Sequence, residues 1–123
     1  MSEGYVRTTT EGGIATLTFH HPKSNSLPTA VLSGMAEQIE AAGKDKAVRA
    51  IILRSDGDKA FCAGASFDEL VAIDSEAKGL AFFNGFAMVI NAIRTAPCLV
   101  IGRVQAKAVG GGFALAAAVD ICY

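Results

Sequence analysis

The chain has 123 residues, of which 51% are hydrophobic and 19% charged, and its formal net charge at pH 7 is −1. This length suits one domain with a hydrophobic core, and the lack of a basic excess argues against nucleic acid or an anionic membrane surface as a partner. The first residues lack the apolar stretch of a signal peptide, and no apolar run approaches the length of a membrane span. We therefore expect a cytoplasmic protein without a membrane segment.

The chain opens with a predicted β-hairpin. Residues 5–10 and 14–20 are rich in β-forming residues, and Glu11-Gly12-Gly13 separates them. In the second run, alternate residues face opposite sides of a sheet. His20 and His21 end this strand, but no Ser, Cys or Asp partner accompanies them in a recognisable motif. A polar strand end therefore explains them better than catalysis does.

A loop is predicted over residues 22–27, followed by a helix. Ser26 and Pro28 are typical of a helix start, and apolar residues then recur at helical spacing up to Gly43, a typical helix end. Residues 50–53 form an apolar run that predicts a buried strand.

Two further helices are predicted in the middle of the chain. Ser66 and Glu69 have the spacing of a capping box, which places the start of a short helix over residues 67–73 at Ser66. A longer helix runs from about residue 75 to residue 95. Asp68 and Glu69 fall in the first turn of the short helix, where negative charge stabilises the helix dipole.

Three consecutive glycines, Gly110–Gly112, lie between a predicted buried strand over residues 98–101 and an alanine-rich helix over residues 113–119. Glycines here leave the unpaired N–H groups of a helix start open to a ligand, or they allow a tight turn with close packing. A dinucleotide motif is excluded because Leu115 occupies the position of its third glycine. Residues 120–123 predict the start of another strand.

A second junction of the same kind follows the strand at residues 50–53. Within residues 59–70, several small residues precede the predicted helix start at Ser66. The N–H groups of Ala65 and Ser66 therefore lie close to a helix start. Two strand-to-helix junctions with little side-chain bulk are what an oxyanion hole made of backbone N–H groups requires.

Residues 61–70 and 104–120 resemble the two signature segments of the crotonase superfamily, the enoyl-CoA hydratase/isomerase family. His21-Pro22-Lys23-Ser24-Asn25-Ser26-Leu27 resembles the early segment of the same family, and all three occur in the order and spacing of the family. The resemblance implies an α/β fold, the crotonase-like (ClpP/crotonase) spiral of β-β-α repeats. It also implies a single domain over residues 1–123 that corresponds to the N-terminal half of the family's length and is apparently truncated.

The resemblance also implies a site. In this family two backbone N–H groups, by position those of Ala65 and Gly111, hold the thioester carbonyl of an acyl-CoA. The residues implied to bind substrate are Lys23 at the CoA phosphates, Ala63 at the adenine, and Gly64, Gly110 and Gly112 along the approach. The implied partners are the acyl-CoA substrate and further copies of the chain, in a trimer or a multiple of it. Neither a metal nor a separate cofactor is implied.

One departure from the family concerns proton transfer. Ala114 stands where hydratases of this family commonly carry a glutamate, and no other carboxylate of the chain is a good substitute. The leading hypothesis is an enoyl-CoA hydratase/isomerase-type enzyme. The alternatives are a non-catalytic or engineered half-domain that binds CoA or self-associates, and a sibling chemistry such as decarboxylation or thioester hydrolysis. The three cysteines, which are widely spaced in apolar sequence, are expected to be reduced core thiols: Cys62, Cys98 and Cys122.

Overall fold

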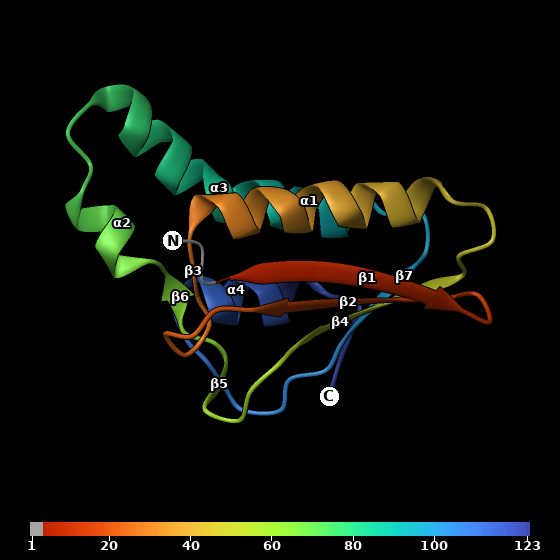
Figure 1. The fold of residues 1–123 in the computed structure, drawn as a ribbon. Helices are drawn as coiled ribbons and strands as arrows, with labels where there is room; N and C mark the ends of the chain where they lie inside the picture. Colours follow the sequence, from red (N-terminus) through yellow and green to blue (C-terminus); the bar gives the residue numbers. More distant parts are fainter. Residues whose placement is uncertain (1–3) are drawn as a thin grey trace.

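The computed structural model describes residues 4–123, which form a five-stranded sheet with helices packed against it (Figure 1). The sheet has the order β1-β2-β4-β7-β9, and all neighbours are parallel except the antiparallel pair β1–β2. Two separate pairs of short parallel strands are β3–β6 and β5–β8. The strands are β1 Tyr5–Glu11, β2 Ile14–His20, β3 Ser26–Leu27, β4 Ala50–Ser55, β5 Ala60–Cys62, β6 Gly64–Ala65, β7 Leu99–Gly102, β8 Lys107–Ala108 and β9 Ile121–Cys122. The helices are α1 Thr29–Lys44, α2 Phe67–Val71, α3 Glu76–Thr95 and α4 Gly111–Ala118.

The predicted hairpin is confirmed, with β1 and β2 paired along their whole length. Gly12 and Gly13 at its tip have φ angles of +60° and +83°. Positive φ at both central residues is typical of the two-residue turns that match the twist of a hairpin. The alternation along β2 is also confirmed, because Ala15, Leu17 and Phe19 are at most 1% exposed.

The core lies between the sheet and the helices α1 and α3, which pack side by side over it (Figure 1). Alternate residues of the central strands point into this core, and the helices contribute their apolar stripes. Its fully buried members include Leu17, Leu32, Met35, Ile39, Ile51, Leu53, Val89 and Val100. Each such side chain contributes about 1.5–3 kcal/mol by leaving water, so this cluster holds the elements in place.

The predicted start of α1 needs correction. Ser26 belongs to the short strand β3, and its hydroxyl donates to the Lys23 carbonyl at 2.9 Å rather than capping the helix. The helix begins after Pro28, and Glu69 of α2 supplies the cap: its Oε1 accepts from the N–H of Thr29 at 2.9 Å and from the hydroxyl of Thr29 at 2.8 Å. The side chain that completes this helix start is 40 residues away in the sequence.

The predicted end of α1 at Gly43 is also wrong, because the helix continues to Lys44 and Asp45 caps it. A Cβ on Gly43 would lie 3.0 Å from Cδ of Pro97. Close packing against the chain that enters β7 therefore accounts for this glycine better than helix termination does.

The helices α2 and α3 and the strand β9 lie close to where the sequence predicts them. Ser66 accepts from the N–H of Glu69 at 3.2 Å, as a helix cap does, but the N–H of Ser66 donates to Leu27 and not to the Glu69 carboxylate. Only half of the predicted capping box therefore forms. The helix α4 begins at Gly111, two residues before the predicted start. The short strands β3, β5, β6 and β8 were not expected.

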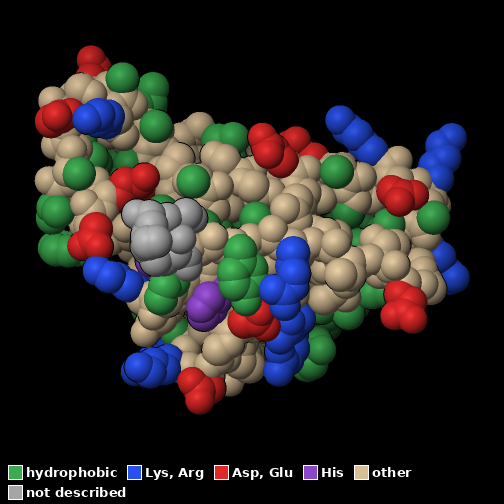
Figure 2. Space-filling model, viewed as in Figure 1, with side chains coloured by type: hydrophobic (Ala, Val, Ile, Leu, Met, Phe, Trp, Pro, Cys, Tyr) green, Lys and Arg blue, Asp and Glu red, His purple; other side chains and the backbone are tan. Residues whose placement is uncertain are grey.

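Hydrophobic side chains are exposed where α2 and the start of α3 extend beyond the sheet (Figures 1 and 2). The most exposed of them are Phe67, Val71, Leu80 and Phe83, each at least 65% accessible. Basic and acidic side chains are interspersed over the face drawn in Figure 2. No helix of the described residues is both long and apolar enough to cross a membrane.

Candidate functional site

The structure brings the two predicted strand-to-helix junctions together. A Cβ on Gly64 would lie 3.8 Å from the backbone nitrogen of Gly111 and 3.5 Å from the carbonyl oxygen of Val109. A Cβ on Gly110 would lie 3.8 Å from Cα of Gly64. The two segments are therefore in backbone contact, although 46 residues separate Gly64 from Gly110 in the sequence.

Strand pairing places the junctions at the same point. The strands β5 and β8 run parallel, with Ala60 opposite Lys107 and Cys62 opposite Ala108. The N–H of Val109 then donates to the Cys62 carbonyl at 3.1 Å. Because parallel strands end at the same edge, the residues that follow each strand meet there.

The three consecutive glycines have different surroundings. Gly110 is exposed and has φ +58° and ψ −129°, a conformation that disfavours any residue with a Cβ. Gly112 is buried, and a Cβ there would lie 2.2 Å from the carbonyl oxygen of Cys62. Gly111 is partly buried, and a Cβ there would lie 2.7 Å from the ring of Phe86. Close packing thus accounts for Gly112, whereas Gly110 is needed for its backbone conformation.

The start of α4 leaves one donor outside its hydrogen bonds. Gly112 donates to Val109 at 2.9 Å, and Phe113 and Ala114 both donate to the Gly110 carbonyl, at 3.0 and 3.3 Å. None of these bonds uses the N–H of Gly111, the first residue of the helix. This N–H lies at the positive end of the helix, where an anionic oxygen is stabilised.

The other predicted site residues lie around these junctions. Ala63 is half-buried and precedes Gly64, and its N–H donates to the Asn25 carbonyl at 3.1 Å. Lys23 is exposed, and its Nζ lies 2.7 Å from Oδ2 of Asp68 at the start of α2. The hydrogen bond and charge of Lys23 lower the pKa of Asp68 below its usual value. Asp68 pairs with Lys23 and Glu69 accepts from Thr29, so both carboxylates have partners of their own.

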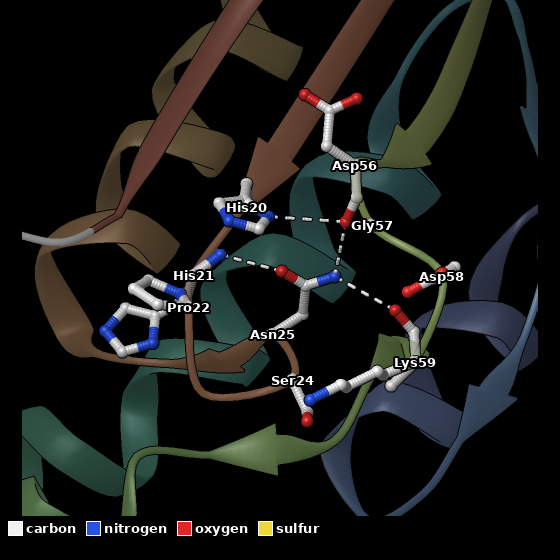
Figure 3. Close-up of a pocket in the computed structure, with 10 residues that line it drawn as sticks. His20, His21, Pro22, Ser24, Asn25, Asp56, Gly57, Asp58 and Lys59 are labelled. Carbon is white, nitrogen blue, oxygen red and sulfur yellow. Dashed lines mark hydrogen bonds between the residues drawn. The ribbon is translucent and has the colours of Figure 1, made fainter.

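The sequence predicts no individual role for Asn25, which belongs to the early segment over residues 21–27. Asn25 is only 2% exposed and lies beside a pocket of about 220 Å³ (Figure 3). Its carboxamide bonds the loop after β2 to Asp56, which follows β4, and to Ala60 of β5. The sequence offered only one signal for Asn25, its place in the early motif. The carbonyl groups that accept from its Nδ2 are 31 to 36 residues away and are not visible in the sequence. The pocket is lined by His20, His21, Pro22, Ser24, Asn25, Asp56, Gly57, Asp58, Lys59 and Ala60.

Asp56, at the end of β4, joins this pocket to the hairpin. Its carboxylate accepts from the Tyr5 hydroxyl, and it pairs with Arg7 at 3.2 Å and with Arg54 at 3.1 Å. The ring nitrogen Nδ1 of His20 lies 3.3 Å from the Asp56 carbonyl oxygen. The Tyr5 hydrogen bond, followed by the charges of Arg54 and Arg7, lowers the pKa of Asp56 below its usual value.

The Asp56 cluster predicts a pH-dependent stability. A depressed folded-state pKa stabilises the fold above the unfolded carboxyl pKa of about 4, and this stabilisation is lost as the pH falls through the folded-state value. We expect Asp56→Asn to lower the free energy of unfolding by about 1 kcal/mol at pH 7. The difference from the unmodified chain should disappear at pH values below the folded-state pKa. Urea unfolding at pH 7, 5, 4 and 3 measures both effects.

Asp74→Asn is the matched control for this prediction, since it removes an exposed i,i+4 pair with Lys78 at 3.0 Å. That change should alter stability by only about 0.3 kcal/mol. An Asp56→Asn difference that stays constant down to pH 3 would contradict the role of the ionised carboxylate.

The three cysteines are free thiols in different environments. Cys62 is fully buried, and burial raises its pKa to about 11. Cys98 is half-buried, whereas Cys122 on β9 is exposed. The expectation of three core thiols is therefore correct for Cys62 and wrong for Cys122, because both residues of the edge strand β9 are exposed.

These environments predict an order of thiol reactivity. At pH 8 we expect a maleimide reagent to label Cys122 first and Cys98 more slowly, and to reach Cys62 only on unfolding, because a buried thiol with a raised pKa holds little thiolate. Mass spectrometry of tryptic peptides over time measures the order. The same reaction in 6 M urea is the control, where all three should react alike. Early labelling of Cys62 in the folded chain would show that β5 opens readily.

Comparison with known proteins gives a consistent result. A model of the enoyl-CoA hydratase/isomerase family matches residues 9–123. The mitochondrial methylglutaconyl-CoA hydratase of Rattus norvegicus is 38% identical over 97 residues, which are 79% of this chain and 30% of that protein. The (7aS)-7a-methyl-1,5-dioxo-2,3,5,6,7,7a-hexahydro-1H-indene-carboxyl-CoA hydrolase of Mycobacterium tuberculosis is 30% identical over 114 residues, which are 93% of this chain and 46% of that protein.

Solved structures agree with the sequence relatives. An enoyl-CoA hydratase from Mycobacterium smegmatis superimposes with a TM-score of 0.87 at 34% identity, covering 95% of this chain and 46% of that one. The chain thus spans less than half the length of these relatives. These superpositions agree with the expected spiral architecture. The chain therefore belongs to the enoyl-CoA hydratase/isomerase family and has the crotonase fold.

Proposed function

We propose that the chain binds the thioester carbonyl of an acyl-CoA between the backbone N–H groups of Ala65 and Gly111. These donors would stabilise the negative charge that develops on the carbonyl oxygen when an enolate-like state forms. The observation that supports this proposal is the contact between the junctions, 3.8 Å from a Gly64 Cβ position to the Gly111 nitrogen. The Gly111 N–H at this point is not used by the hydrogen bonds of its helix.

The direction of the second donor follows from strand geometry. Ser66 donates its N–H to Leu27 of the neighbouring strand β3. Since successive N–H groups of a strand point to opposite edges, the Ala65 N–H would point away from β3, toward the side where α4 contacts β6. Ala65 itself is exposed, so a ligand has access to this position.

Two fixed donors suit the chemistry of thioesters. Hydration, isomerisation, decarboxylation and hydrolysis of an acyl-CoA all build negative charge on the carbonyl oxygen. Donors that are already oriented stabilise this charge without reorganising, and one of them contributes about 3 kcal/mol to the transition state. The two relatives named above are a methylglutaconyl-CoA hydratase and a hydrolase of a carboxyl-CoA compound. Of these reactions we propose hydration or isomerisation of an enoyl-CoA for this chain.

Proton transfer is not assigned to this part of the site. Ala114 occupies the position where the resemblance places a glutamate, and a methyl group cannot carry a proton. Asp68 and Glu69 are held by Lys23 and Thr29. We therefore assign to the described residues the binding and polarisation of the thioester.

The rest of the substrate has a suggested path along the same surface. The Ala63 carbonyl would accept from the adenine, and Lys23 would exchange Asp68 for CoA phosphates, since exposed ion pairs are weak. The acyl group would lie against the exposed apolar side chains of α2, which begins two residues after Ala65. A homo-oligomer, trimeric or a multiple of three, stays a prediction that sedimentation velocity can test.

A conjugated acyl-CoA tests the proposal. Hydrogen bonds to its carbonyl polarise the acyl chromophore, so bound cinnamoyl-CoA should absorb at longer wavelength than free cinnamoyl-CoA and should compete with acetyl-CoA. CoA without an acyl group is the control and should bind more weakly. Equal affinity for CoA and cinnamoyl-CoA, with no spectral shift, would overturn the proposal. Binding with the shift but without turnover of crotonyl-CoA would agree with the absence of a proton-transfer group.

A further inference from the structure

Asn25 makes an unusually complete set of hydrogen bonds. Its Oδ1 accepts from the N–H of His21 at 2.7 Å. Its Nδ2 donates to the carbonyl oxygens of Asp56 and Ala60, both at 3.0 Å (Figure 3). It also lies 3.3 Å from the carbonyl oxygen of Phe61. Both ends of a nearly fully buried carboxamide are thereby satisfied, and a carboxylate or an apolar group could not replace it in this environment.

The backbone of Asn25 is as constrained as its side chain. Ser24 and Asn25 have φ angles of +56° and +59°, a left-handed conformation that Asn tolerates better than most residues. The N–H of Asn25 donates to the His21 carbonyl at 3.0 Å and closes the loop that carries Lys23. The residue thus combines a backbone conformation with a side chain that few other residues offer together.

The partners of Asn25 lead directly to the proposed thioester site. Ala60 and Phe61 belong to β5, and the Asn25 carbonyl accepts from the N–H of Ala63 at 3.1 Å. The next two residues after Ala63 form β6, which carries the proposed donor at Ala65. On its other side β5 pairs with β8, the strand that leads to Gly111. A displacement of the loop at Asn25 would therefore be transmitted to the proposed donors.

We propose that Asn25 is a positioning residue, which holds the loop 21–25 against β5 and thereby sets the position of the Ala65 N–H relative to the Gly111 N–H. Asn25 does not touch the thioester in this arrangement; it acts through residues 60–63. The expected effect on thioester binding rests on the proposed function. The expected effect on the backbone position of residues 63–65 does not depend on it.

Two substitutions replace Asn25 by residues that tolerate a positive φ. They therefore test the hydrogen bonds of the side chain while the backbone conformation is kept. Asn25→Gly removes the carboxamide, and Asn25→Asp keeps its shape and the acceptor for His21 but places a carboxylate oxygen against three carbonyls. Ser24→Gly is the matched control, because Ser24 is the neighbouring residue and also has a positive φ. Its side chain makes no hydrogen bond with residues 4–123 in the structure. Each variant is compared with the unmodified chain by ¹H–¹⁵N correlation spectra and by the affinities for acetyl-CoA and for CoA.

We expect both Asn25 variants to shift the N–H signals of residues 63–65 and of Gly111, while signals in the middle of α1 stay in place. The ratio of acetyl-CoA affinity to CoA affinity should fall about tenfold in these variants. Ser24→Gly should leave both the signals and the ratio unchanged. A purely structural Asn25 would lower stability without changing this ratio in the folded fraction.

The outcomes separate the two proposals. If the Asn25 variants keep the signals of residues 63–65 and the affinity ratio of the unmodified chain, the positioning role is wrong, whether or not the chain binds acyl-CoA. If the unmodified chain does not distinguish acetyl-CoA from CoA, the proposed function fails and the spectra alone decide on the positioning. If neither Asn25 variant folds, the residue serves the fold as a whole and the inference is overturned.

Discussion

Replacement of Gly112 by alanine should destabilise the chain by about 3 kcal/mol, the upper range for overpacking in a well-packed interior. The added Cβ would lie 2.2 Å from the carbonyl oxygen of Cys62 and 2.7 Å from its Cβ. The carbonyl oxygen belongs to the backbone of β5, so it cannot rotate away as the end of a flexible side chain could. The first turn of α4 would have to move away from β5, and both proposed donors lie beside that contact. Urea unfolding followed by circular dichroism measures the loss.

Gly79→Ala is the matched control for this prediction. Gly79 lies in α3, and a Cβ there would be 3.6 Å from Cγ2 of Ile73, an ordinary contact. Alanine should stabilise the helix at this position by about 0.5–1 kcal/mol relative to glycine. The two substitutions are chemically identical and are expected to have effects of opposite sign. Similar unfolding midpoints for both variants would mean that α4 does not pack on β5 as described.

Replacement of Gly111 by proline should remove one proposed donor without breaking the helix. Gly111 is the first residue of α4, the position where proline is tolerated because its N–H has no partner within the helix. Loss of one oxyanion donor lowers the rate of thioester chemistry by about 10²–10³, or about 3 kcal/mol in the transition state. The spectral shift of bound cinnamoyl-CoA should also decrease sharply, since it depends on the same hydrogen bond.

Gly111→Ala provides the control, because it adds the same Cβ against the Phe86 ring, 2.7 Å away, and keeps the N–H. The ring belongs to a side chain that can move, so both variants should lose a similar amount of stability. The proline and alanine variants should then differ in the spectral shift of bound cinnamoyl-CoA alone. Equal shifts in the two variants would exclude the Gly111 N–H as a donor to the carbonyl.

Much of the fold could be predicted because its signals are local. Alternation along residues 14–20 marks the buried face of β2, and Gly12 and Gly13 provide the two positive φ angles of the hairpin turn. The spacing of apolar residues predicts α1 and α3, and Ser66 caps α2 as its position suggests. In each case the residues that determine the structure are at most a few positions apart, so their pattern is visible in the sequence.

The errors arose where distant residues complete a local element. Ser26 was expected to start α1, but it pairs with Gly64, and the cap comes from Glu69 of another helix. Gly43 was expected to end the helix, but it makes room for Pro97. A short strand such as β8 exists only because β5 lies beside it. Such pairings depend on tertiary contacts, which override local preference.

The sequence by itself determined the class of fold, the family and the two glycine-rich junctions, because helical and strand periodicity and motif spacing are properties of neighbouring residues. The tertiary structure decided that the junctions touch, that Gly112 is required by the backbone of β5, and that Asn25 ties the early loop to that strand. The physical reason is that these contacts join backbone groups dozens of residues apart. A backbone carbonyl is chemically the same in every residue. The sequence therefore does not indicate which carbonyl group a buried carboxamide or a helix start will contact.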